Sequence, residues 1–440
     1  MATPPPSLAH TSSSELLKRF DGASGPEIRL GLTRVKTVLE RLGNPQDALP
    51  PVIHIAGTNG KGSVSAYLRA LLESTGARVH VFNSPHLVTL HDGILIGGHP
   101  IGEDLLANAL LSVAQHDPER HLTSFEALTL AAIEAMRTEP ADFAVLEAGL
   151  GGRDDSTNVV TAPAATVLTP IGLDHQEFLG DTVREIASHK IGILRKGVPV
   201  IVGPQDQDVE NLIEAEADRL GAPLYLFNRD WSVFEQHGRL VFQDDQGLLD
   251  LDLPPLHGRF QIENAGTALM TFRLLSRDAA NNPSLLDKAL KSVTWPGRLQ
   301  RLTSGPLVET FEAPTELWVD GGHNAHAAEA LSQALADMDE RTPLPTHLIL
   351  GMRANKDLAA FLTPFAGLVR GIQAVPLPDA TIGRAPQDVA AAALAQGFAV
   401  EAAPSIEKAL SNLTKDAAQP KRILICGSLL LAGQVLADHT

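Results

Sequence analysis

One short segment of the chain combines glycines, a lysine and hydroxyl side chains in the order that phosphate binding requires. It reads Gly57-Thr58-Asn59-Gly60-Lys61-Gly62-Ser63 and joins the β-branched run 52–56 to an amphipathic stretch. Glycines let backbone N–H groups turn toward phosphate oxygens, the following helix N-terminus adds positive potential, and a lysine can neutralise the β- and γ-phosphates. The segment predicts a nucleotide site, and the alternative is a turn that only resembles one.

The loop departs from the usual P-loop pattern. Gly62 stands where Ser or Thr usually follows the lysine, and only two residues separate Gly57 from Gly60. The loop is therefore a variant, and residues elsewhere must identify the class of nucleotide-binding protein.

Side chains that could bind a metal ion follow other predicted strands. Glu147 lies near the end of the apolar run 143–148, Ser84 comes two residues after the predicted strand 78–82, and His175 lies in the loop that follows the predicted strand 165–168. Ligands bind at the carboxyl ends of parallel strands, where a carboxylate suits Mg²⁺. Taken singly, Glu147 could be solvated, Ser84-Pro85 could be a turn, and His175 could be a packed histidine.

Together these motifs resemble the Mur ligase superfamily, and within it the folylpolyglutamate and dihydrofolate synthases. The segments that carry the resemblance, spread from about residue 28 to 435, are the phosphate loop, Ser84-Pro85-His86-Leu87, 146–153, Asp174-His175, 320–324, 351–357 and 426–429. The resemblance implies transfer of the γ-phosphoryl group of ATP to a carboxylate. An amine then attacks the acyl phosphate, giving an amide, ADP and phosphate.

The resemblance also implies roles for single residues. The implied catalytic residues are Lys61, Glu147, His175 and Lys190, and the implied Mg²⁺ ligands are Ser84, Glu147, His175 and a carbamylated Lys190. ATP would be bound by Gly57, Thr58, Asn59, Gly60, Lys61, Gly62, Ser63, Asn264, Arg298, Asp320 and His323. Thr123, Phe125 and Asp155 would line the acid substrate. Alternatively, Lys190 and Arg298 could form salt bridges, and Phe125 could pack in the core.

The implied substrates are ATP, L-glutamate and dihydropteroate or a reduced folate, with ATP and Mg²⁺ as cofactors and a monovalent cation left open. The usual Glu-Arg after Ser-Pro-His-Leu is Asp92-Gly93 here, and Asp154 replaces a usual Leu. A paralogous ligase for another aromatic or pterin-like acid is therefore the first alternative. A P-loop regulatory NTPase is the second, against which the 320–324 motif argues, and a degenerate nucleotide-binding module is the third.

Sequence periodicity predicts the elements that position these residues. Strands are expected at 52–56, 78–82, 143–148 and 165–168, and helices at 27–42, 63–74, 125–136, 182–194 and 261–275. This alternation predicts a mostly parallel sheet with helices on both faces. An antiparallel hairpin or edge of that sheet is expected at 231–253, and further strands at 317–319, 348–350, 372–375 and 423–426.

A chain of 440 residues is long for a single core. We expect an α/β fold with a P-loop ATP-binding domain over 26–297, a smaller Rossmann-like domain over 298–440, and a loosely packed lead-in over 1–25.

Composition excludes several classes of partner. The formal charge of −17 opposes broad attraction to nucleic acid or an anionic membrane surface. Cys426 is the only cysteine, which excludes an internal disulfide and fits the cytoplasm. No secretory leader or membrane span is expected, and the resemblance implies a monomer.

Overall fold

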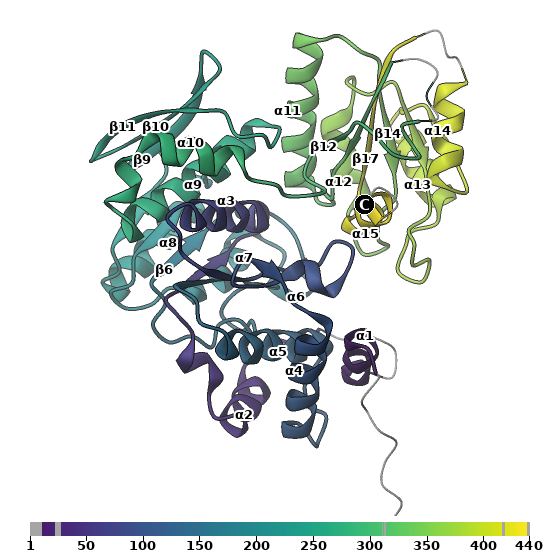
Figure 1. Ribbon diagram of the computed structural model, residues 1–440. Helices are drawn as coiled ribbons and strands as arrows, with labels where there is room; N and C mark the ends of the chain where they lie inside the picture. The colour runs from purple at the N-terminus through teal and green to yellow at the C-terminus, as the bar shows by residue number, and fades with distance from the viewer. Residues whose placement is uncertain (1–10, 23–27, 310, 312–313, 416–418, 438–440) are drawn as a thin grey trace, which may run out of the picture.

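The computed structural model describes residues 11–22, 28–309, 311, 314–415 and 419–437. Figure 1 shows two lobes, each built from a sheet with helices packed against it. The predicted α/β fold, with a mostly parallel sheet and a second α/β domain, is confirmed.

The first sheet has the strand order β4-β3-β2-β5-β1-β6-β7-β8. All pairs from β2 to β8 are parallel, whereas β3 and β4 are antiparallel at one edge. The strands are β1 (Val52–Ala56), β2 (Val79–Phe82), β3 (Ile94–Ile96), β4 (His99–Pro100), β5 (Phe143–Glu147), β6 (Ala165–Leu168), β7 (Val200–Val202) and β8 (Leu224–Leu226). All five residues of β1 are buried, as expected for a central parallel strand.

Helices cover both faces of this sheet. On one face Ile53 and Ile55 pack with α3 (Lys61–Glu73), α9 (Arg259–Leu275) and α10 (Pro283–Lys291). On the other face lie α2 (Thr33–Arg41), α4 (Glu103–His116), α5 (Ser124–Thr138), α7 (Val183–Lys190) and α8 (Gln207–Leu220). The short helices of this half are α6 (Gln176–Leu179), η2 (Pro45–Ala48), η3 (Leu90–Gly93), η4 (Ile191–Ile193) and η5 (Ala279–Asn281).

The segment 231–253 forms a sheet of its own. β9 (Trp231–Gln236), β10 (Arg239–Asp244) and β11 (Gly247–Asp252) pair antiparallel in the order β11-β10-β9. The predicted antiparallel pairing is confirmed, but the alternative that it forms an edge of the main sheet is wrong. The apolar side chains of these strands pack onto α9 in the core instead, so they do not extend the edge beyond β8.

The second domain has a six-stranded sheet in the order β12-β13-β17-β14-β15-β16, parallel except for β12. Its strands are β12 (Gln300–Leu302), β13 (Thr315–Val319), β14 (Thr346–Leu350), β15 (Gly371–Ala374), β16 (Val400–Ala402) and β17 (Lys421–Cys426). Its helices are α11 (Ala325–Arg341), α12 (Leu358–Leu362), η6 (Thr363–Phe365), α13 (Pro386–Ala395), α14 (Ile406–Thr414) and α15 (Leu429–Ala437). The Cys426 thiol is free and buried at the end of β17.

The N-terminal segment is better packed than the sequence predicts. Residues 11–22 contain α1 (Ser13–Leu17) and η1 (Lys18–Phe20), and Ser12 and Glu15 form a capping box. Leu16 is buried, and the Ser13 hydroxyl donates a 2.8 Å hydrogen bond to Glu103 of α4. The expectation of a loose lead-in over 1–25 is therefore wrong for residues 11–22. Residues 1–10 and 23–25 lie outside the described residues.

Two predicted helices are shorter than expected. The first begins at Thr33 because Gly31 has a φ of +122° and its N–H donates to the Asp154 carbonyl, which keeps this residue out of the helix. Residue 27, where the prediction began, is not described. The helix predicted over 182–194 ends at Lys190, and the 3₁₀ segment η4 follows it.

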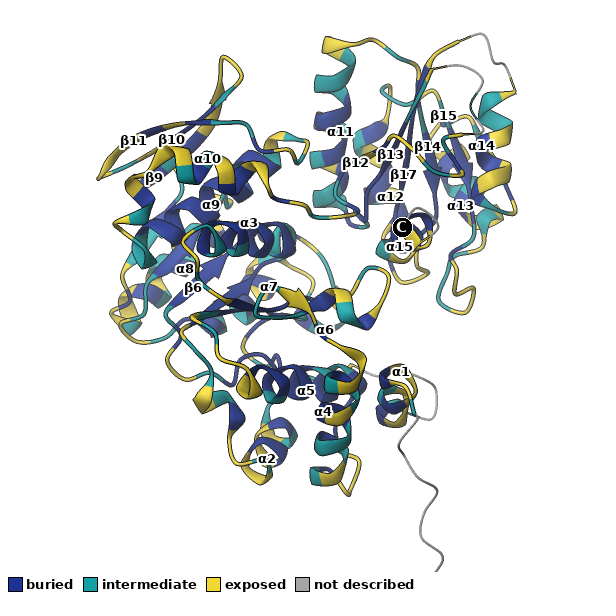
Figure 2. Ribbon diagram, viewed as in Figure 1, coloured by how far each residue is buried: buried dark blue, intermediate teal, exposed yellow. Residues whose placement is uncertain are grey.

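In both lobes the central strands are buried and the helices expose their outer faces, as Figure 2 shows, whereas β4 and parts of β9, β11 and β16 are exposed. In the described part of the chain, every helix is too short or too polar to cross a membrane.

Candidate active site

The phosphate loop joins the end of β1 to the start of α3, as predicted. Gly60 has a φ of +86°, and a Cβ there would lie 2.5 Å from the Asn264 side-chain oxygen, so only glycine fits. Asn264 in turn donates to Gln261, which donates to the Ser63 hydroxyl over 3.2 Å. The loop is thus held against the first turns of α9.

Two lysines meet at the carbonyl of Gly57. Lys61 Nζ donates to the carbonyls of Gly57 and Thr58 over 3.2 and 3.1 Å, and it lies 3.8 Å from Glu147 Oε1. Lys190 Nζ reaches the same Gly57 carbonyl from α7 over 2.6 Å. Lys61, Glu147 and Lys190, which lie far apart in sequence, are therefore brought together.

The proposed metal ligands follow the ends of β2, β5 and β6. Ser84 donates a backbone hydrogen bond to Glu147, and Ser84 Oγ and His175 Nδ1 are buried without a hydrogen-bond partner in the described structure. Unpaired buried polar atoms are costly, and they persist where a function uses them. Hydroxyl and carboxylate oxygens suit Mg²⁺, and a neutral imidazole can also bind a metal ion, so this donor set fits.

Burial shifts the protonation of these groups. It raises the pKa of Glu147 to about 7, although the positive charges of Lys61 and Arg298 act in the opposite direction. Burial lowers the pKa of Lys190 to about 7, and the neighbouring charge of Lys61 adds to this effect. Burial likewise lowers the pKa of His175 to about 4, so its imidazole is neutral near pH 7. A neutral imidazole can bind a metal ion, and a neutral amine can react with CO₂.

The remaining loop residues contact their surroundings through side chains. Thr58 Oγ exchanges 3.0 Å hydrogen bonds with the backbone of Gly172, which lies after β6. Gly62 packs against the indole of Trp295, where a Cβ would approach within 2.6 Å. Asn59 points across to the second domain, where it contacts Asn324 and His326.

The second domain contributes a charged wall at the linker. Asp320 is buried and accepts hydrogen bonds from the N–H groups of Leu299 and Gly322 over 2.7 and 2.6 Å. Burial raises the Asp320 pKa, while the charge of Arg298 lowers it. Arg298 thus interacts electrostatically with acidic groups of both domains, Glu147 and Asp320. His323 Nε2 lies 3.6 Å from Asp174, next to His175.

Comparison with known proteins identifies the family. Residues 55–272 match the Mur ligase middle domain, and residues 297–429 match the glutamate ligase domain of Mur ligases. The folylpolyglutamate synthase of Lacticaseibacillus casei is 33% identical over 418 residues, which cover 91% of this chain and 92% of the relative. The chain belongs to the folylpolyglutamate and dihydrofolate synthase family. It is an ATP-dependent ligase.

Solved structures of this synthase family share the whole fold. Escherichia coli FolC in complex with DHPP and ADP has a TM-score of 0.85 and 29% identity, with 98% of each chain covered. A folylpolyglutamate synthase/dihydrofolate synthase with Mn, AMPPNP and L-glutamate bound has a TM-score of 0.82 and 29% identity, with 99% of each chain covered.

The three expected substrate-lining residues of this synthase occupy different environments. Phe125 and Ser84 line a cavity of about 390 Å³ between α1, α5 and the loop after β2. Thr123 is the N-cap of α5 and shares a capping box with Glu126. Asp155 is buried and accepts hydrogen bonds from Leu150 N–H and from the N–H and hydroxyl of Thr157. Of the three, Phe125 alone borders the cavity.

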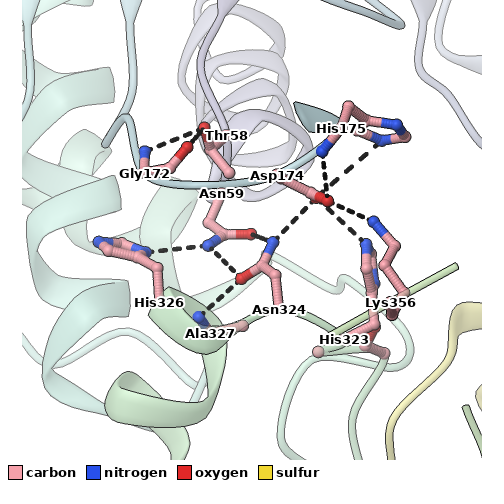
Figure 3. A network of polar contacts seen from close by, with 12 residues as sticks. Thr58, Asn59, Gly172, Asp174, His175, His323, Asn324, His326, Ala327 and Lys356 are labelled. Atoms are coloured by element: carbon pink, nitrogen blue, oxygen red, sulfur yellow. Dashed lines mark hydrogen bonds and ion pairs between the residues drawn. The ribbon is translucent and has the colours of Figure 1, made fainter. Parts of the chain in front are cut away.

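Four residues that join the two domains of the synthase, Asp174, Asn324, His326 and Lys356, were not predicted from the sequence. Figure 3 shows Asp174 facing His323, Asn324 and Lys356, and His326 facing Asn59. Burial alone would raise the Asp174 pKa, but a hydrogen bond from His323 and the charges of His323 and Lys356 hold that pKa well below its ordinary value. Three of the four lay inside quoted motifs, but no local pattern shows that Asp174 and Lys356, 182 positions apart, form an ion pair.

Proposed function

We propose that this chain joins L-glutamate to dihydropteroate or to a reduced folate, using ATP and Mg²⁺ through an acyl phosphate. The observation that carries this proposal is the cluster of Lys61 with the buried Glu147 and Lys190 near Gly57, beside the unpaired Ser84 hydroxyl and His175 imidazole. Relatives of the same fold, solved with DHPP and ADP or with Mn, AMPPNP and L-glutamate, support it.

Each residue of the group has a physical role in this proposal. Ser84, Glu147, His175 and a carbamylated Lys190 would hold Mg²⁺, which when bound neutralises charge on the transferred phosphoryl group. Lys61 and the loop N–H groups bind the β- and γ-phosphates, and Asn264, Arg298, Asp320 and His323 bind ATP from α9, the linker and the second domain.

The chemistry proceeds in two displacements. The carboxylate of the acid attacks the γ-phosphorus, forming the acyl phosphate as ADP leaves. The amine of glutamate then attacks the acyl carbon. The amide bond forms as phosphate leaves. Closed domains exclude the water that would hydrolyse the acyl phosphate.

The 390 Å³ cavity is the proposed site of the aromatic acid. Phe125 offers a ring face for stacking, and Ser84 at the wall of the cavity is also a proposed metal ligand. The acid would therefore lie beside the metal site. Thr123 would act mainly by holding α5, which carries Phe125, and Asp155 by holding the loop that directly follows Glu147.

The two departures from the family pattern have local explanations. Asp92 accepts hydrogen bonds from the N–H groups of Val88 and Thr89, and so caps η3. A Cβ at Gly93 would lie 2.6 Å from the Asn83 carbonyl oxygen. Asp154 pairs with Arg153 over 3.1 Å on a partly exposed surface. Of these three residues Gly93 alone lines the proposed acid cavity, so the choice between a folate and another acid rests on the substrates tested below.

We also propose that the enzyme acts as a monomer in a reducing compartment such as the cytoplasm, with an ATP-binding domain over 26–297 and a ligase domain over 298–440. One chain supplies both walls of the site, and its single thiol is buried. Light scattering of the purified chain tests the monomer.

The decisive experiment is ATP turnover with Mg²⁺, with dihydropteroate or tetrahydrofolate, and with or without L-glutamate. The expected result is ADP formation that requires both acid and glutamate, with a glutamyl adduct detected by mass. Hydrolysis indifferent to both would support a regulatory NTPase, and activity with another acid alone would identify a paralogous ligase.

A further inference from the structure

The tip of the phosphate loop contacts the second domain through one side chain. Asn59 Nδ2 donates to Asn324 Oδ1 over 3.1 Å and to His326 Nδ1 over 2.9 Å, and Asn59 Oδ1 accepts from Asn324 Nδ2 over 3.2 Å. Both N–H donors of the Asn59 amide are therefore used by the second domain, so in this arrangement neither is free for a phosphate oxygen.

Asn324 contacts three structural elements at once. Its Oδ1 accepts from Asn59 and, over 2.8 Å, from the Ala327 N–H as the N-cap of α11, while its Nδ2 donates to Asn59 and, over 3.0 Å, to Asp174 Oδ2. This accounts for both donors and both lone pairs of the amide. Asn324 is also buried, with 6% of its surface exposed. Its orientation is fixed, because reversing the amide would turn an oxygen toward the Asp174 carboxylate.

The two partners of Asn324 in the first domain, Asn59 and Asp174, belong to the two loops that carry the proposed chemistry. Asn59 lies in the phosphate loop, two residues before Lys61, and Asp174 directly precedes His175. Figure 3 shows Asn324 between these loops, reaching both from the start of α11. A single side chain of the second domain therefore fixes the spacing of two loops of the first.

We propose that Asn324 is a positioning residue that aligns the phosphate loop with the loop of His175 when the domains close, and that Asn59 is its receptor rather than a ligand of ATP. This assignment rests on the proposed ligase function. It changes the role that the family resemblance implies for Asn59. In the proposed function Lys61 and Asn264 bind the nucleotide, so we expect the closing contact of Asn59 to be separable from nucleotide affinity.

Asn324→Ser and Asn59→Ala test this assignment, alone and together. Serine keeps a good N-cap for α11 but is too short to reach Asn59 and Asp174. We expect either change to lower kcat by about 10- to 100-fold, the cost of a small misplacement, while the Kd for ATP changes less than about twofold. Because both act through one contact, the double variant should be no slower than the slower single variant.

Asn324→Asp is a more severe probe. It keeps the N-cap but places a carboxylate against Asp174, so we expect a larger loss of kcat than with serine. A serine variant slower than the aspartate variant would contradict the proposed contact with Asp174.

Arg259→Ala is the matched control. Arg259, the first residue of α9, joins the domains through two hydrogen bonds of 2.8 and 2.9 Å to Asp337 of α11. We expect kcat within about twofold of the wild type, because this exposed ion pair positions neither loop. An equal loss in Arg259→Ala and Asn324→Ser would mean that any interdomain contact matters, and would overturn the assignment.

Two further measurements separate the outcomes. The first is the affinity for ATP. If Asn59→Ala weakens ATP binding at least tenfold and Asn324→Ser does not, Asn59 is a nucleotide ligand and the proposal is overturned. Small-angle scattering with ATP and Mg²⁺ should give a larger radius of gyration for both variants than for the wild type. If the wild type formed no glutamyl adduct, the proposed function would fail, yet scattering and ATP affinity would still test the contact.

Discussion

Three ionisable side chains lie buried below the phosphate loop: His54 on β1, Glu147 at the end of β5 and Lys190 on α7. His54 Nε2 is 2.9 Å from the Thr157 hydroxyl, which donates in turn to Asp155. Because the Thr157 hydroxyl donates to Asp155, it accepts its other hydrogen bond from the Nε2–H of His54. Burial, helped by the charge of Arg195, lowers the pKa of His54 to about 3.

Because His54 is buried in its neutral form, we expect the protein to lose stability in acid. The unfolded chain takes up a proton near pH 6.5 whereas folded His54 does not until about pH 3, so unfolding gains protons between these values and stability falls as pH falls. At pH 5 the cost relative to pH 7 is about 2 kcal/mol. His54→Gln keeps a donor to Thr157 but does not titrate. Urea unfolding at pH 5 and pH 7 should show that the variant loses less stability in acid than the wild type. An equal loss of stability would show that His54 does not cause it.

Lys190 predicts a dependence on CO₂. With a pKa of about 7, its amine changes from mostly charged at pH 6 to mostly neutral at pH 8, and only the neutral amine forms a carbamate. ¹³C-bicarbonate should give a carbamate signal in the wild type that grows over this range and is absent in Lys190→Arg. We expect the variant to be about 10- to 100-fold less active. A wild type without this signal would show that Lys190 acts only as a cation.

At the scale of elements, α5 joins stability to the proposed acid site. The Thr123 hydroxyl accepts from the Glu126 N–H, and the Glu126 carboxylate accepts from the Thr123 N–H over 2.8 Å. Phe125, at the wall of the cavity, lies within this first turn. The cap therefore fixes the position from which the aromatic ring reaches the cavity.

Thr123→Ala should cost about 1 kcal/mol of stability, and Thr123→Ser should restore it. Calorimetry should show a melting temperature lower by about 2–4 °C for alanine alone. We expect the KM for the acid to follow the same order, because a frayed first turn displaces Phe125. A serine variant with wild-type stability but a raised KM would mean that the threonine methyl group contacts the substrate.

Elements with strong local patterns were predictable, and contacts between elements were not. The apolar β-branched run 52–56 and the glycine loop after it predicted β1, the loop and α3 closely, because backbone propensity and burial agree there. The start of α2 was missed because Gly31 leaves the helical region in a stretch with helical periodicity. The ion pair of Asp174 with Lys356 depends on how the two domains meet, which no local pattern encodes.

At the scale of the whole molecule, the loop after β2 reaches into the second domain. Leu87 packs against the core cluster that contains Ile425 and Leu431, and a Cβ at Gly433 of α15 would lie only 2.1 Å from the Leu87 carbonyl oxygen. The helix and the loop are therefore in direct backbone contact. The same loop carries Ser84, so the position of α15 affects the proposed metal site.

Gly433→Ala should separate the domains at this point. The added methyl group cannot fit against a backbone carbonyl, so we expect kcat to fall by about 100-fold while the helix itself gains propensity. Steady-state kinetics and small-angle scattering measure the two effects. Gln434→Ala, on the exposed face of the same helix, is the control and should leave both unchanged. An active, compact Gly433→Ala variant would show that the loop can move away without loss.

The buried thiol of Cys426 has a practical consequence for observing these motions. Burial raises its pKa, so at neutral pH this side chain is an unreactive thiol within β17. Cysteines introduced at exposed positions of each domain, such as Asp218→Cys on α8 and Glu407→Cys on α14, could therefore be labelled with fluorescent dyes while Cys426 stays in place. Energy transfer between the dyes would follow opening and closing in single molecules during turnover.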